Sequence, residues 1–442
     1  MIQLSDHFDY KRLLRFTFPS IVMLVFASIY GVVDGFFVSN FAGKTPFAAV
    51  NFIMPVLIIL GCAGFMFGTG GSALIAKTLG EGDKKRANEV FSLLVYAAAG
   101  SGVVLAAAGF ALMPAIAAGL GAQGQLLEDS VTYGRIILLA LPFYILQMEF
   151  QCLFVTAEKP KLGLAVTVAA GMTNMVLDAL FVGAFRWGLE GAAAATTISQ
   201  LVGGAIPLAY FGRENSSLLR LGRCRLDGGA LLKACTNGAS ELMSNISASV
   251  VSMLYNARLM AQAGEDGVAA YGVLMYVSMI FQAIFIGYSV GVAPVVGYHY
   301  GAGGREELKG LLRRSVVLIG SFSVVMCLAG EGLGRPLAVL FVGYDQGLLD
   351  MTAHAFSIFS ISFLFSGLAI FGSSFFTALN DGLTSALISF LRTLVFQCAA
   401  VVLFSYLWGL DGIWWSIVAA EVMAVAVTLA FLAGKRKKYG YL

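Results

Sequence analysis

The sequence predicts an all-α membrane protein with twelve transmembrane helices in two pseudo-symmetric six-helix lobes. Of its 442 residues, 59% are apolar and 12% are charged, and the mean hydropathy is +0.84, whereas soluble domains carry about 25% charged residues. Apolar stretches of roughly 20 or more residues recur along the chain, each long enough to cross a hydrocarbon core of about 30 Å. The second half of the chain also repeats the first.

We count twelve apolar stretches and interpret each as one membrane-spanning helix. No polar stretch between them is long enough to form an independent soluble domain. The stretches cover residues 13–40, 47–76, 89–118, 131–157, 162–185, 191–211, 234–261, 268–299, 315–342, 352–379, 383–407 and 412–434.

The repeat has an offset of 221 residues, which is half of 442. Trp187-Gly188-Leu189-Glu190-Gly191 aligns with Trp408-Gly409-Leu410-Asp411-Gly412, and Gly80 aligns with Gly301. A gapless match of this kind indicates an internal duplication. Transporters are commonly built from two such halves, with the substrate site between or within them.

The basic residues predict the orientation, because cytoplasmic loops collect Lys and Arg. Placing the N-terminus inside puts 22 of the 28 basic residues on the cytoplasmic side. Both termini are then cytoplasmic, and the two halves have the same orientation. We expect an N-lobe over 1–212, a cytoplasmic linker over 213–230 and a C-lobe over 231–442 with a basic tail. The expected location is the plasma (inner) membrane.

The sequence lacks the motifs of several function classes. No G-x-x-x-x-G-K-[ST] loop is present, so ATP binding of that kind is excluded. The six cysteines and three histidines are scattered, which argues against a metal site. We expect no enzyme activity, no cofactor and no nucleic-acid partner. Energy for transport would come from an ion gradient.

Ionisable residues within apolar spans are the best functional candidates, because burying them unpaired in hydrocarbon is costly. Asp34 and Asp178 form the best pair. They lie 22 residues beyond Arg12 and 17 residues beyond Lys161, about 33 and 26 Å of helix, so both should sit in the outer half of the N-lobe. Such a pair could bind Na⁺ through oxygen ligands or hold a proton. The alternative is that the two acids only cap backbone or join helices.

Two polar neighbours share helix faces with these acids. Asn174 precedes Asp178 by four residues, and Tyr30 precedes Asp34 by four.

The chain resembles the multidrug and toxic compound extrusion (MATE) family over essentially its whole length, and most resembles the MepA-like bacterial branch. The resemblance rests on the order and spacing of several short segments. These are Pro19, Tyr30 to Val38 around Asp34, Gly80 to Asp83, Glu158 to Lys161, Asn174 to Asp178, and Asn237 to Glu241.

The resemblance implies a MATE-type fold in which two lobes enclose a V-shaped cavity that opens alternately to either side. It implies export of small-molecule drugs or cationic dyes in exchange for H⁺ or Na⁺, without ATP. The implied residue roles are a cation or Na⁺ site at Asp34, Asn174, Asp178 and Thr196 with Tyr30 beside it, a helix bend at Pro19, and an ion or substrate contact at Glu241. The span 352–379 has no acid, which argues against a coupling carboxylate there.

For the other polar residues within the apolar spans, the sequence allows more than one role. Glu149, with Gln151, is a candidate substrate contact, or it pairs with a polar neighbour. Glu241 is either an anionic contact or a carboxylate satisfied by Ser244 or Asn245. We interpret Arg392 and Glu421 as structural.

Three rival functions are weaker. A lipid-linked oligosaccharide flippase of the same superfamily would line its cavity with several basic residues, and Arg392 alone gives little support for such a cavity. A membrane-embedded prenyltransferase would need metal motifs that are missing. A passive pore would not need paired buried acids. We therefore expect a monomeric antiporter in the lipid bilayer.

Overall fold

A computed structural model describes residues 2–42, 44–343 and 345–441, and these form helices without any strand. The elements are α1 (Tyr10–Phe37), η1 (Val38–Ala42), α2 (Lys44–Gly80), α3 (Lys84–Gly119), α4 (Gly124–Leu139), α5 (Leu141–Thr156), α6 (Pro160–Asp178), η2 (Ala179–Ala184), α7 (Gly188–Gly212), α8 (Gly228–Gly301), α9 (Arg305–Val342), α10 (Gln346–Phe359), η3 (Ser360–Ser362), α11 (Phe363–Ala378), α12 (Gly382–Phe390), η4 (Leu391–Val395) and α13 (Phe396–Tyr439).

The described residues supply twelve membrane crossings. Nine helical stretches are long and apolar enough to span a membrane, and the bent pair α4–α5 makes ten. Two of the ten stretches, Gly228–Gly301 and Gly382–Tyr439, have 74 and 58 residues, more than twice the length that one crossing needs. They are broken at Gly264 and Gly409. Each therefore crosses twice, so the all-α fold with twelve spans is confirmed.

Glycine forms these sharp breaks because no side chain restricts its backbone. Gly264 has φ 63° and ψ −149°, and Gly409 has φ 62° and ψ −134°, a region that is essentially restricted to glycine. Gly188, the repeat counterpart of Gly409, has φ 60°. The Trp-Gly-Leu segments that the two halves share thus each contain a glycine with a positive φ at a tight turn.

One expected span is bent. The stretch predicted as a single helix over 131–157 is α4 followed by α5, with an angle of 59° between them at Ala140. Pro142 lies in the first turn of α5. Proline there has no N–H to donate to the end of α4, so the two helices do not join into one.

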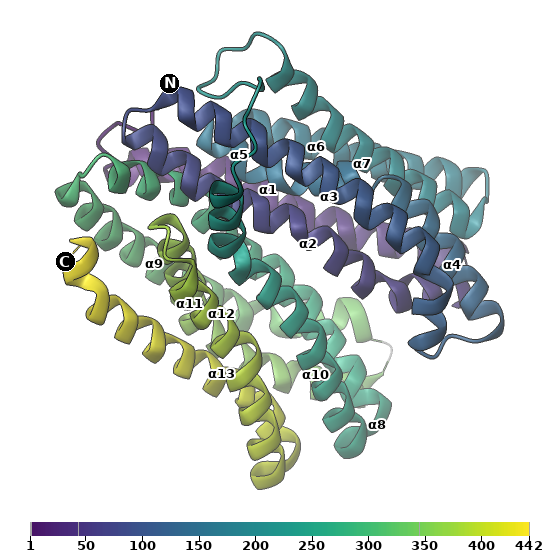
Figure 1. Cartoon of the computed structure of the whole chain (residues 1–442). Helices are drawn as coiled ribbons and strands as arrows, with labels where there is room; N and C mark the ends of the chain where they lie inside the picture. Colours follow the sequence, from purple (N-terminus) through teal and green to yellow (C-terminus); the bar gives the residue numbers. More distant parts are fainter. Residues whose placement is uncertain (1, 43, 344, 442) are drawn as a thin grey trace.

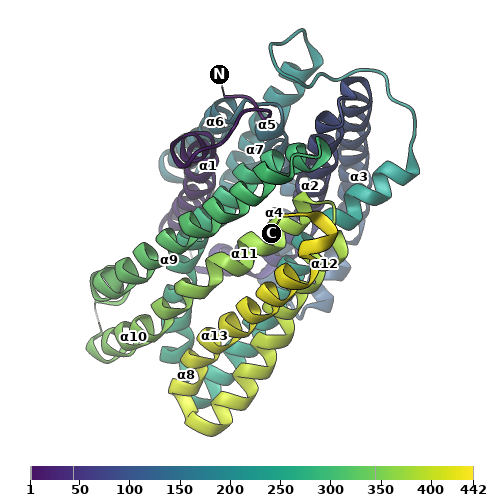
Figure 2. The same ribbon diagram turned by 90° about the vertical axis from the view of Figure 1, so that its left-hand side faces the viewer.

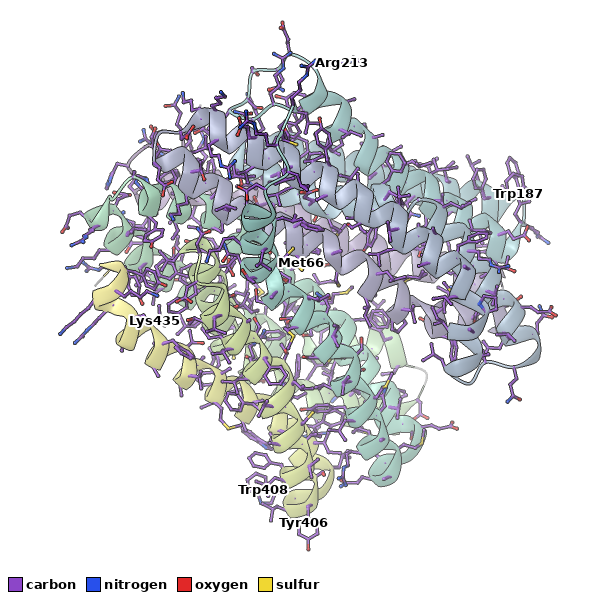
Figure 3. All side chains as sticks on the ribbon, viewed as in Figure 1. Met66, Trp187, Arg213, Tyr406, Trp408 and Lys435 are labelled. Atoms are coloured by element: carbon purple, nitrogen blue, oxygen red, sulfur yellow. The ribbon has the colours of Figure 1, made fainter. Side chains whose placement is uncertain are left out.

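The helices form two lobes, α1–α7 and α8–α13 (Figure 1). In a view turned by 90°, α9–α13 again lie together (Figure 2). The lobes approach each other near the two chain ends and diverge in the opposite direction. Trp187 of the first lobe and Trp408 of the second lie at the two diverging ends, far from Lys435 (Figure 3).

The lobes meet where α2 and α1 pack against α8. Four glycines bring the backbones of α2 and α8 into direct contact, and we call them the glycine seam: Gly70, Gly80, Gly238 and Gly301. A Cβ atom added to each would lie 2.0 Å from a backbone oxygen of the opposite helix, namely that of Ala234, Tyr298, Met66 and Lys77 respectively. No side chain fits there while the lobes are closed at this end.

Aspartate side chains begin several helices by accepting backbone N–H groups, as N-caps do. Asp9 accepts from Arg12 (2.7 Å) at the start of α1, and Asp83 accepts from Arg86 (2.9 Å) at the start of α3. Asp227 caps α8 in the same way, after the irregular segment that follows α7. These caps fix where each helix emerges at the end of the molecule that carries both termini.

Candidate functional site

The two candidate acids come together because α1 packs closely on α6. Gly171 of α6 makes this possible, since a Cβ there would lie 2.5 Å from Phe26 and 2.8 Å from Tyr30, both on α1. About two turns further along from Gly171, Asp34 lies next to Asp178. Asp178 directly precedes the π-helical turn η2, and Asp34 lies one helical turn before the π-helical turn η1; such turns are frequent at functional sites.

Asp34 and Asp178 lie within interaction distance of each other, and Asn174 contacts Asp34. Asp178 is fully buried, and Asn174 is 2% exposed. Among the described residues, neither carboxylate oxygen of Asp178 has a hydrogen-bond partner, nor does Oδ1 of Asp34. Two ionised carboxylates this close in a dry environment repel strongly, so the pair needs a shared proton or a cation.

The remaining predicted residues surround this pair. Asn174 Nδ2 donates to Thr196 Oγ1 at 3.4 Å, which makes this a weak hydrogen bond. Tyr30 interacts electrostatically with Asp34 and contacts Gln147. The structure therefore gathers carboxylate, amide and hydroxyl oxygens from α1, α6 and α7. Oxygen ligands of these types suit Na⁺.

Sequence reasoning missed Tyr133. This tyrosine of α4 is 1% exposed. It interacts electrostatically with Asp34 and Asp178 and hydrogen-bonds Thr196. Its position in the apolar span 131–157 gave no signal of this role, because the spacing along one helix does not reveal which neighbour its phenol will meet.

Pro19 lies within α1, which continues unbroken from Tyr10 to Phe37. The proline is buried. It lies two helical turns from the start of α1, and Asp34 lies near the opposite end. The role of Pro19 as a bend point of α1 stays a prediction.

A polar cavity of about 260 Å³ lies mainly in the C-lobe, where Glu241 lines it, and Thr69, Ser72 and Cys152 of the N-lobe complete its wall. We call it the C-lobe cavity. Most of the other lining side chains carry hydroxyl or amide groups: Thr69, Ser72, Ser244, Asn245, Gln282, Ser289, Ser373, Ser374, Thr377, Ser389 and Thr393. Asn245 donates to the backbone oxygen of Glu241 at 2.8 Å rather than to its carboxylate. The carboxylate is therefore not satisfied by Asn245.

Arg392 also lines this cavity, but its charge is paired. Its Nε lies 2.9 Å from Oε2 of Glu421, and its Nη2 lies 2.8 Å from Oε1. Such a two-point contact fixes the guanidinium plane against the carboxylate. Arg392 sits in the π-helical turn η4, so the ion pair ties this turn to α13.

Glu149 and Gln151 are buried within α5 of the N-lobe and do not line the C-lobe cavity. Neither carboxylate oxygen of Glu149 has a hydrogen-bond partner among the described residues, and the same holds for the Gln151 amide. Cys152, on the same helix, interacts electrostatically with both Glu149 and Glu241. No group of three or more His, Cys, Asp or Glu side chains with a metal-binding arrangement occurs in the described ranges.

A family model, MatE, matches residues 19–180 and again residues 242–403. The chain belongs to the MATE family. The two matches have equal length and are offset by 223 residues, close to the offset of 221 that the internal repeat shows. The MATE unit thus occurs twice in this chain, once in each lobe.

Two comparisons extend this finding. The chain is 23% identical over 422 residues to the multidrug export protein MepA of Staphylococcus aureus (strain MRSA252), covering 95% of this chain and 92% of that protein. It also superimposes on an outward-facing conformation of a multidrug resistance MATE family transporter with a TM-score of 0.93, at 20% identity and coverage of 99% and 98%.

A third comparison finds the same fold in a further transporter. A MOP superfamily transporter from Pyrococcus furiosus, described as having a binding pocket of reverse polarity that suggests a different function, matches with a TM-score of 0.90, 21% identity and coverage of 98% and 96%.

Proposed function

We propose that this MATE transporter is a secondary active antiporter that exports cationic or amphiphilic small molecules in exchange for H⁺ or Na⁺. The observation that supports the proposal is the buried pair of Asp34 and Asp178, which lie side by side while three of their four carboxylate oxygens have no hydrogen-bond partner among the described residues. A proton or a sodium ion relieves their repulsion. Binding of either ion is thus linked to the packing of α1 against α6.

We attribute the coupling between ion binding and substrate export to α1, which carries Asp34 near one end and Pro19 nearer the other. Occupation of the acid pair changes the forces on the outer end of this helix, and a bend at Pro19 transmits the change to the cavity. Release of the ion to the cytoplasm resets the carrier. A membrane potential of 100 mV contributes about 2.3 kcal/mol for each charge moved across it.

The C-lobe cavity supports a cationic substrate. Glu241 contributes a negative charge, while the guanidinium of Arg392 is neutralised by Glu421. The net charge of this cavity is therefore negative. A lipid-linked oligosaccharide flippase would need unpaired cations to hold a pyrophosphate, and Arg392 does not provide one.

The proposed location is the plasma (inner) membrane, with both termini in the cytoplasm and a single chain as the working unit. The orientation is supported by the excess of Lys and Arg in the loops on one side, because basic segments stay on the cytoplasmic side. In this orientation, the glycine seam closes the cytoplasmic end and the lobes diverge outward.

Transport in proteoliposomes tests the proposal. Ethidium movement is measured under an imposed pH gradient and, separately, under an imposed sodium gradient. At least one gradient should drive ethidium uphill, and Asp178→Asn should abolish this coupling. Uphill transport by Asp178→Asn at the normal rate would disprove the role of the acid pair.

A further inference from the structure

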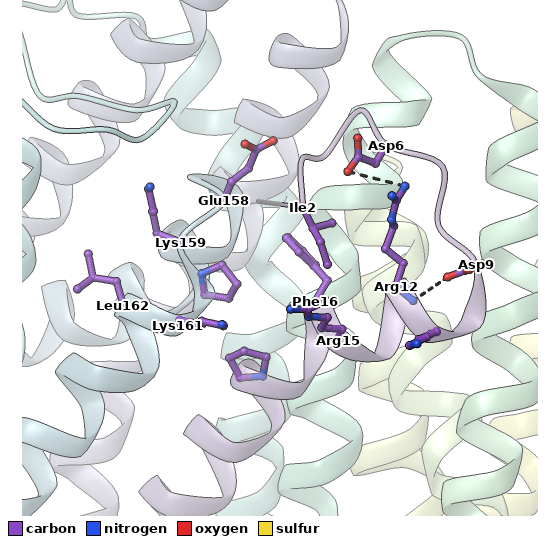
Figure 4. A pocket seen from close by; sticks show the side chains of 13 residues that line it. Ile2, Asp6, Asp9, Arg12, Arg15, Phe16, Glu158, Lys159, Lys161 and Leu162 are labelled. Atoms are coloured by element: carbon purple, nitrogen blue, oxygen red, sulfur yellow. Dashed lines mark hydrogen bonds and ion pairs between the residues drawn. The ribbon is translucent and has the colours of Figure 1, made fainter.

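A cavity of about 750 Å³ lies outside the sites described above. It is formed by the N-terminal segment (residues 2–9), the first turns of α1 and the start of α6 (Figure 4). The N-terminal segment lies across this end of both lobes. Its Leu4 N–H donates to Glu158 of the N-lobe (2.6 Å), and its Phe8 N–H donates to Glu307 of the C-lobe (3.0 Å).

The charges around this cavity are predominantly positive. Five basic and three acidic residues line it: Lys11, Arg12, Arg15, Lys159, Lys161, Asp6, Asp9 and Glu158. Each of the three acids already accepts a backbone N–H. Asp9 accepts from Arg12 (2.7 Å), Asp6 from Gln3 (3.1 Å) and Glu158 from Leu4 (2.6 Å). The acids thus hold the N-terminal segment and the start of α1 in place.

Three of the basic side chains are left without an acidic partner. Within the described residues, no ion pair within 4.0 Å joins Lys11, Arg15 or Lys161 to a carboxylate. Arg15 and Lys161 belong to different helices, and Figure 4 shows their side chains extending toward one another. Two like charges directed at the same space repel each other, and an anion between them removes that repulsion.

The deeper wall of the cavity is apolar. Phe16 is 3% exposed, and Pro19, Pro160 and Leu162 complete this wall. Phe16 and Pro19 lie further along α1 than Lys11 and Arg15, toward the membrane interior. The cavity is therefore amphipathic, with basic groups at its cytoplasmic rim and an apolar surface below them.

We propose that this cavity binds the phosphate group of an anionic ligand, with Arg15 and Lys161 as its main contacts. Guanidinium and ammonium groups are strong phosphate donors. Basic pockets between transmembrane helices at the cytoplasmic side suit anionic lipid headgroups. The apolar wall favours a phospholipid over free phosphate, because it offers a surface for the glycerol and the upper acyl chain.

Native mass spectrometry of the full-length protein in detergent tests the site without any transport measurement. The ligands are phosphatidylglycerol, phosphatidylcholine and inorganic phosphate. We expect phosphatidylglycerol to bind more tightly than phosphatidylcholine. The double variant Arg15→Gln/Lys161→Gln should weaken phosphatidylglycerol binding about 30-fold, from roughly 1 kcal/mol per basic side chain removed. Each single variant should weaken it about fivefold.

The matched control is Arg223→Gln/Arg225→Gln, which removes the same charge from exposed positions of the segment between the lobes. It should bind phosphatidylglycerol like the unaltered protein. Equal binding of both lipids by the unaltered protein, or equal losses in the two double variants, would overturn the proposal. Displacement of phosphatidylglycerol by millimolar inorganic phosphate would identify a phosphate site that is filled from solution.

A second measurement rests on the proposed function. Pro19 lines the cavity, so a bound headgroup contacts the part of α1 that is proposed to bend. Ethidium transport should therefore differ between phosphatidylglycerol-rich and phosphatidylcholine vesicles, and Arg15→Gln/Lys161→Gln should remove the difference. Lipid binding without any effect on transport would leave the site intact and refute only its link to the bend.

Discussion

The glycine seam permits a quantitative test of alternating access. An alanine at Gly80 would place Cβ 2.0 Å from the backbone oxygen of Tyr298, and an alanine at Gly301 would place it 2.0 Å from that of Lys77. Real Cβ contacts are essentially never under 3.0 Å. Because the obstructing atoms are backbone, α2 and α8 must separate by about 1 Å instead of rotating a side chain away.

Overpacking of this kind costs about 1–3 kcal/mol, which corresponds to a factor of about 5–150 in an equilibrium constant. The cost applies only while the lobes touch at this end. Gly80→Ala and Gly301→Ala should therefore shift the population toward the conformation in which the cytoplasmic ends are apart.

Distance measurements between two spin labels by double electron–electron resonance can report this shift. Spin labels on Lys85 and Lys309, which are exposed and lie on different lobes, should show a larger fraction of long distances in both variants. Gly100→Ala serves as the control, because a Cβ at Gly100 meets nothing within 4 Å. Unchanged distance distributions in folded Gly80→Ala and Gly301→Ala proteins would refute the reasoning.

Four further predictions concern single residues. Asp178→Asn should abolish gradient-driven ethidium transport while leaving ethidium binding within a fewfold of normal; loss of binding by fluorescence titration would instead indicate a substrate contact. Glu241→Gln should weaken ethidium binding about tenfold or more, since a charge-assisted contact contributes about 1.5–3 kcal/mol, and unchanged affinity would remove Glu241 from the substrate site. Gly409→Ala should lower the free energy of unfolding by about 1–3 kcal/mol because of its positive φ. Gly434→Ala, within α13 and with open space around it, should leave the melting temperature unchanged or raise it slightly in the same thermal-shift assay, because alanine favours helix over glycine. Equal melting temperatures for the two variants would contradict this account. Burial acts to raise the pKa of Asp381, but hydrogen bonds from Lys435, Tyr439 and Thr384 outweigh it, so the pKa lies below its usual value. The folded pKa is thus below the unfolded value of about 3.9, and the stabilisation is complete above that pH and is lost as pH falls through the folded pKa. The melting temperature should fall on acidification below about pH 4, and the fall should be smaller in Lys435→Met; identical pH profiles would rule out this linkage.

The crossings of the membrane could be predicted because hydrocarbon imposes a length on every apolar helix. Asp34 and Asp178 could be paired from sequence because their distances from Arg12 and Lys161 place them at similar depths. The duplication also indicated turns, since Gly188 and Gly409 both have a positive φ. These features depend only on position along one helix.

Contacts between helices could not be predicted in this way. Tyr133 interacts with the acid pair from α4, which is inclined to α5 by 59°, and no pattern within 131–157 predicts either the angle or the contact. The Arg392–Glu421 pair joins residues 29 positions apart, on helices whose rotation about their axes the sequence leaves open. Glu149 is buried in the N-lobe, and both of its carboxylate oxygens lack a hydrogen-bond partner among the described residues, so its role as a substrate contact stays a prediction.

The glycine seam also bears on how such a chain could arise. Gly80 touches Tyr298 while Gly301 touches Lys77, and the two contacts exchange under the repeat offset of 221 residues. This reciprocal pattern is that of an isologous interface, as in a homodimer with a two-fold axis. A half-length ancestor pairing with its own copy would make the same contact. Gene fusion then lets each half change separately, so that one keeps two acids where the other carries Tyr255 and Ala399.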